Sequence, residues 1–66
     1  MKITSIKARN LREGMLLATG NDKLYVIEVE DRNDDLVLIR GSYAGPNEYP
    51  SATMVFPNYE TVKIFV

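Results

Sequence analysis

The acidic residues in the middle of the chain are the first candidates for chemistry. Five carboxylates are clustered there: Glu28, Glu30, Asp31, Asp34 and Asp35. Asp31, Asn33 and Asp35 have the spacing that opens a calcium-binding loop, but such a loop also needs glycine at its sixth position and glutamate at its twelfth. Leu36 and Ser42 stand at those two positions. We therefore expect no metal or other cofactor, and we interpret the cluster as a solvated acidic tip on a hairpin.

The residue types that most often carry out catalysis are missing. The sequence has no histidine and no cysteine, so it lacks the commonest general base and the best thiol nucleophile. Its serines, Ser5, Ser42 and Ser51, have no evident activating partner in the sequence. We expect that the protein is not an enzyme.

Length and composition restrict the remaining possibilities. Sixty-six residues make one domain, residues 1–66, and an apolar content of 45% is ordinary for a globular protein. The absence of cysteine fits a reducing cytoplasm. No apolar run approaches a membrane span, and polar residues interrupt the N-terminal segment as they would not in a signal peptide. We expect a cytoplasmic protein that makes no membrane contact.

Six segments show the short, apolar, β-rich pattern of strands: residues 1–8, 15–18, 23–31, 36–40, 53–56 and 61–66. Asn10 is suited to cap a single helical turn, Leu11 to fill the core, and Gly14 to leave the turn with a positive φ. These features predict an all-β fold, a small SH3-like barrel of five to six short antiparallel strands with one or two single helical or 3₁₀ turns. An OB-fold is the alternative.

Alternation within the strands predicts which residues form the core. Tyr25, Ile27 and Val29 share one face of the first hairpin arm, and we expect them to pack on Val37 and Ile39 of the return arm. Two further features concern the ends of the chain. The three-residue spacing of its apolar positions predicts a bulge near Ser5 in the first strand. The last strand is apolar and has no segment after it, which predicts weak self-association through its edge.

The loop over residues 41–51 is a candidate binding element. It contains two glycines, two prolines, Tyr43 and Tyr49, and loops on rigid barrels often carry binding sites. Exposed tyrosines suit protein contacts and base stacking alike. The alternative is that both rings fold back and cap an open end of the barrel.

The start of the chain resembles a known family. Residues 8–15 read Ala-Arg-Asn-Leu-Arg-Glu-Gly-Met, and Tyr25-Val26-Ile27 follows. This pattern resembles the SH3-like, KOW-like N-terminal barrel of bacterial elongation factor P over roughly the first third of the chain. The resemblance implies the fold only. That family carries a modifiable basic residue on a glycine-rich hairpin, whereas the longest hairpin here is acidic.

Two hypotheses for function follow. The first is a protein-interaction or regulatory accessory protein, with phage as its suggested origin, that binds a protein partner through Asp31, Asp34, Asp35, Tyr43 and Tyr49. The second is a barrel that binds single-stranded nucleic acid or RNA through Lys7, Arg9, Arg12 and Lys63. The net charge of −1 favours the first, because nucleic-acid binders usually carry a basic excess.

Overall fold

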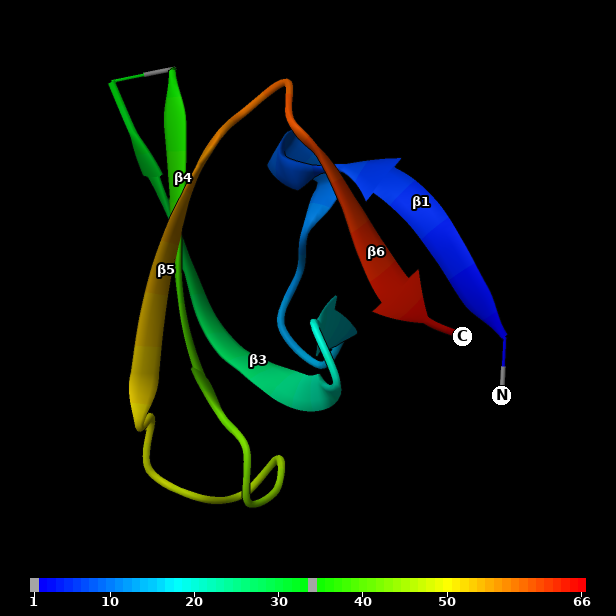
Figure 1. The fold of residues 1–66 in the computed structure, drawn as a ribbon. Coiled ribbons are helices and arrows are strands. Elements are labelled where there is room, and N and C mark those ends of the chain that lie inside the picture. The colour runs from blue at the N-terminus through cyan, green and yellow to red at the C-terminus, as the bar shows by residue number, and fades with distance from the viewer. Residues whose placement is uncertain (1, 34) are drawn as a thin grey trace.

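The computed structural model describes residues 2–33 and 35–66, which form one antiparallel sheet (Figure 1). Its strands are β1 (Ile3–Lys7), β2 (Leu16–Thr19), β3 (Asp22–Arg32), β4 (Leu36–Ser42), β5 (Ala52–Pro57) and β6 (Thr61–Phe65). They lie side by side in the order β1-β6-β2-β3-β4-β5. Apart from the 3₁₀ turn η1 (Ala8–Asn10), the described residues contain no helix. The all-β class and the six antiparallel strands are thus confirmed.

The sheet bends strongly without closing (Figure 1). In the described part of the chain, no ladder joins the edge strands β1 and β5. The long strand β3 carries the bend: its start pairs with β2 and the rest with β4. An SH3-like barrel therefore stays a prediction, since the observed sheet is an open one.

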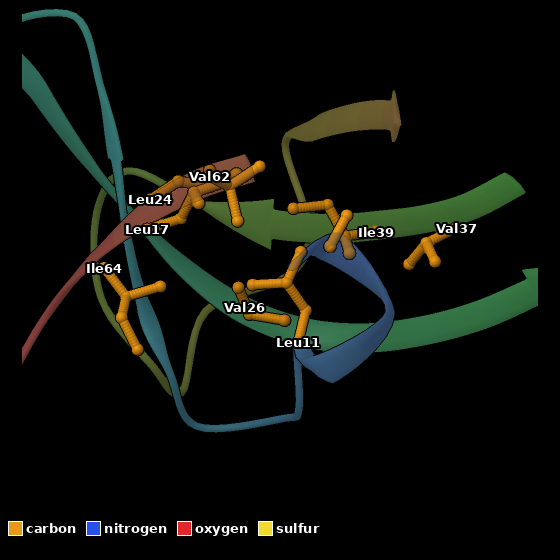
Figure 2. Packing of buried hydrophobic residues seen from close by; sticks show 9 residues of the cluster. Leu11, Leu17, Leu24, Val26, Val37, Ile39, Val62 and Ile64 are labelled. Carbon is orange, nitrogen blue, oxygen red and sulfur yellow. The ribbon is translucent and has the colours of Figure 1, made fainter. Parts of the chain in front are cut away.

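The core fills the inside of this bend. Leu11 follows η1 and is fully buried, as predicted, among apolar side chains of β2, β3, β4 and β6 (Figure 2). The chain then leaves through Gly14, which has the expected positive φ of 91°. Asn10 is not the cap that we expected. It is the last residue of η1, and Lys7 occupies the N-cap position without a side-chain hydrogen bond.

The predicted core face of β3 is wrong in its first half. Leu24 and Val26 are buried and face the core, while Tyr25 and Ile27 are only partly buried. The register shifts between Val26 and Glu28, so Ile27 is the extra residue of a β-bulge. A bulge reverses the alternation, and Val29 therefore packs against the core after all. Val37 and Ile39 face the core as predicted.

The two ends of the chain also differ from expectation. Strand β1 pairs with β6 in continuous register from Ile3 to Lys7, so there is no bulge at Ser5. Ile3 is simply 55% exposed on the outer face, while Ile6 packs against the core. Strand β6 is not an edge, because it pairs with β1 on one side and β2 on the other. The predicted self-association through an unpaired edge of β6 is therefore not supported.

Candidate binding site

The acidic tip of the β3–β4 hairpin is anchored to the body of the protein. Asp31 and Asp35 are exposed, and Asp34 lies outside the described residues. The backbone oxygen of Asp35 accepts a hydrogen bond from the Asn58 amide at 2.8 Å, and the Asn58 oxygen accepts one from the Arg9 amide at 3.0 Å. Hairpin tip, β5–β6 turn and η1 are therefore held together by main-chain bonds.

This anchoring places opposite charges near one another. Arg9 and Asp31 line a hollow of about 150 Å³, and Arg12 and Asp31 line a second one of about 470 Å³. The Arg12 guanidinium donates to the backbone oxygens of Arg9 and Leu11. Two residues of the predicted nucleic-acid set thus lie beside the predicted acidic site. The positive arginines and the negative carboxylates weaken each other's electrostatic potential, so this region does not form a surface of one charge sign.

The tyrosine loop lies at the other end of the hairpin (Figure 1). Tyr43 is 48% exposed and Tyr49 is 93% exposed, so these rings do not cap the fold. The loop is fixed at its base, where the Ser42 hydroxyl accepts hydrogen bonds from the Ala44 and Gly45 amides. Because β4 separates the tip from the loop, the structure does not unite the two parts of the predicted protein-binding site.

Two residues of the predicted basic set do share a surface. Lys7 and Lys63 are exposed on neighbouring strands, β1 and β6, and the Lys7 ammonium donates to the Thr61 hydroxyl at 3.2 Å. The sequence hypothesis grouped them with Arg9 and Arg12. The structure places Lys7 and Lys63 on neighbouring strands of the sheet, Arg9 in η1 and Arg12 just after it.

A cleft that the sequence did not predict lies where β2 and β6 separate. Their ladder has only two residue pairs, Leu16 with Phe65 and Leu17 with Ile64. Beyond them, residues 17–20 and 60–63 line an open cleft of about 410 Å³, whose remaining wall is Met54 and Phe56 of β5. We call this the β5–β6 cleft. The alternation of apolar residues predicted strands at these positions. It could not predict the cleft, because the early end of the β2–β6 ladder has no sequence signal.

The β5–β6 cleft has an apolar lining and one buried hydroxyl without a partner among the described residues. Leu17, Met54, Phe56 and Val62 supply the apolar surface. The Thr19 hydroxyl is buried and makes no hydrogen bond with the described part of the chain. Lys63 and Glu60 supply one charge of each sign. An arrangement of apolar surface with a few polar groups is typical of a ligand site.

Comparison of the chain with protein-family models, curated proteins and solved structures finds no match. The resemblance to elongation factor P therefore stays an expectation. No helix in residues 2–33 and 35–66 is long and apolar enough to cross a membrane. Within those same residues, no group of three or more acidic side chains is placed to hold a metal ion.

Proposed function

We propose that the protein is a non-enzymatic binding module that holds an extended segment of a protein partner in the β5–β6 cleft. The observation that carries this proposal is the cleft itself, with an apolar lining, free strand edges and an unsatisfied hydroxyl in one place. The proposal keeps the partner class favoured by the net charge and moves its site away from the acidic tip.

Unpaired backbone along the cleft favours a peptide as ligand. Ala18 and Thr19 pair with β3 on one side only, and residues 61–63 pair only with β1. The sides that face each other across the cleft have no ladder partner among the described residues. A peptide strand offers amide donors and carbonyl acceptors at the matching spacing, which is how extended segments add to sheet edges.

Strand β5 contributes a second open edge. It pairs with β4 on one side, and no described strand pairs with the other. Its sequence, Ala-Thr-Met-Val-Phe-Pro, has no charged residue. Natural proteins usually protect an edge strand with charges or bulges, and β5 has neither a charge nor a register shift. An edge of this kind is suited to a partner strand.

The cleft does not suit nucleic acid. Its lining has one cation, Lys63, and one anion, Glu60, so it carries no net charge. Binding to a phosphate backbone needs several uncompensated cations. Apolar pockets beside an open strand edge instead select alternate side chains of an extended peptide.

Selection from a random 12-residue peptide library displayed on phage tests the proposal. Enriched peptides are synthesised and titrated into ¹⁵N-labelled protein. We expect the largest amide shifts at residues 18–20, 52–56 and 61–63. Shifts confined to the tyrosine loop or to the hairpin tip would overturn the assignment of the cleft.

Two neighbouring substitutions on β5 provide a matched pair. Met54→Lys keeps an aliphatic stem against the core but places an ammonium in the cleft, so peptide affinity should fall about 10-fold or more. Thr53→Lys adds the same charge at an exposed position that alternates with Met54, and it should leave the affinity unchanged. The cleft would be excluded as the binding site if both variants lost the same peptide affinity. It would also be excluded if selection on the wild type enriched no peptide beyond those enriched on Met54→Lys.

A further inference from the structure

The lysines and arginines of this protein occupy different surfaces. Three of the four lysines are exposed on one outer face of the sheet, which is formed by β1, β6, β2 and the first part of β3. They are Lys7 on β1, Lys63 on β6 and Lys23 on β3. Along each strand they alternate with residues that face the core, such as Ile6, Leu24 and Val62. None of the other residues at outward positions on this part of the sheet is acidic. We call it the lysine face.

A row of apolar side chains crosses the lysine face. The registers place Ile3 opposite Phe65, Phe65 opposite Leu16, and Leu16 opposite Tyr25. These four residues come from four adjacent strands, so they form a continuous line across the sheet. Ile3 is 55% exposed, and the other three are partly exposed. The row therefore contains two partly exposed aromatic rings, Phe65 and Tyr25.

The lysines all lie on the same side of this row. Lys63 is two residues from Phe65 and Lys23 is two residues from Tyr25, each on its own strand, while Lys7 lies further along β1. The registers show that these positions lie in the same direction from the row on each strand, because Ser5 is opposite Lys63 and Ala18 is opposite Lys23. A line of positive charge thus runs beside the row of apolar side chains.

Lys23 connects the two lines. Its ammonium lies 5.1 Å from the centroid of the Phe65 ring, within range of a cation–π interaction. This contact leaves the charge uncompensated, because an aromatic ring has no net charge. The ammonium covers a face of the Phe65 ring, so a base that stacks there displaces it toward the adjacent phosphate.

We infer that the lysine face binds single-stranded nucleic acid, with bases on the apolar row and phosphates along the lysines. Binding of single strands combines aromatic platforms with a positive track. A duplex hides its base faces and would use the lysines alone. An anionic membrane surface offers phosphates but no planar bases to stack on the two rings. This surface adjoins the peptide site proposed in the β5–β6 cleft, because Lys63 lines both, whereas Lys7, Lys23 and the apolar row lie outside the cleft.

Fluorescence anisotropy with a labelled 20-nucleotide oligo-dT and oligo-U tests the inference. Three lysine–phosphate contacts predict a slope of log affinity against log salt of about −2. The affinity should therefore fall about 20-fold between about 50 mM and about 200 mM salt. No binding at about 50 mM salt, or binding that does not depend on salt, would overturn the inference.

A charge-matched pair of triple variants locates the site. Lys7→Gln with Lys23→Gln and Lys63→Gln should lower the affinity at about 50 mM salt at least about 20-fold. Arg9→Gln with Arg32→Gln and Arg40→Gln removes the same charge elsewhere and should change it less than about 3-fold. Equal losses would show that only net charge matters. Circular dichroism melting confirms that both variants fold.

A third variant separates stacking from charge. Phe65→Leu should weaken binding about 5-fold or more and leave the salt slope unchanged. Vesicles of anionic phospholipid provide the opposing ligand, and binding to vesicles without binding to oligonucleotide would overturn the inference. Met54→Lys should bind the oligonucleotide at least as well as wild type, so failure of the peptide proposal and failure of this one are distinguishable.

Discussion

On the outer face of the second half of the sheet, formed by the end of β3 with β4 and β5, each arginine lies beside a glutamate. Arg32 contacts Glu30 at 3.1 Å, and Arg40 contacts Glu28 at 3.4 Å. On the lysine face, in the first half of the same sheet, no lysine forms an ion pair within residues 2–33 and 35–66. The first arrangement cancels charge locally, and the second leaves it available to a ligand. The protein therefore has one surface with paired charges and one with unpaired positive charges, although its net charge is only −1.

The bulge at Ile27 separates these two halves. Before it, even-numbered residues of β3 face the core, as Leu24 and Val26 do; after it, odd-numbered residues such as Val29 do. The reversal turns Glu28 and Glu30 outward, where their arginine partners lie. One extra residue thus lets a single strand serve two sheet halves with different sequence patterns.

Deletion of Ile27 is the strongest way to break this comparison. Without the extra residue, either Glu28 and Glu30 turn toward the core or the ladder with β4 shifts. Burying two carboxylates costs several kcal/mol each, against a total stability of about 3–10 kcal/mol for a domain of this size. We expect no cooperative unfolding transition by circular dichroism. Deletion of Asn47, exposed in the tyrosine loop, is the control and should leave a folded protein.

Truncation on opposite faces of neighbouring strands should have unequal effects. Leu24 is fully buried in the core, while Leu16 lies on the lysine face and is only partly buried. We expect Leu24→Ala to lower the free energy of unfolding by about 2–5 kcal/mol, and Leu16→Ala by about 1 kcal/mol. Urea denaturation measures both. Equal losses would mean that the row on the lysine face is as closely packed as the core.

The smallest expected effect concerns the arginine–glutamate pairs. Both partners of the Arg40–Glu28 contact are more than a third exposed, and exposed ion pairs contribute about 0–1 kcal/mol. Arg40→Gln should therefore change the free energy of unfolding by less than about 1 kcal/mol in the same urea experiment. A larger loss would show that this face is held by its charges, which would sharpen its contrast with the lysine face.

The strands could be predicted from the sequence because apolar alternation and turn residues are local properties. Leu11 and Gly14 were predictable for the same reason, since a turn that plugs a core has a local signature. The faces of β3 were not, because a bulge adds a residue without changing residue type. The neighbours of β6 were not, because pairing with β1 joins residues from near opposite ends of the sequence.

The candidate sites were less predictable than the fold. Asp31 and Arg9 are far apart in the sequence but line one hollow, and proximity of that kind depends on how the hairpin folds over η1. The tyrosine loop and acidic tip flank one strand, whose direction keeps them apart. Lys23 was not in the predicted basic set of Lys7, Arg9, Arg12 and Lys63, because only the strand pairing brings it to the same face as Lys7 and Lys63.

The β1–β6 ladder has a consequence for the order of assembly. The β3–β4 hairpin joins segments that follow each other in the chain, so the surface with the arginine–glutamate pairs needs only local contacts. The lysine face needs β1 and β6, which closes nearly the whole chain into one loop. Closing a long loop costs entropy before any contact offsets it. The surface proposed to bind nucleic acid therefore exists only once the most distant parts of the chain have paired.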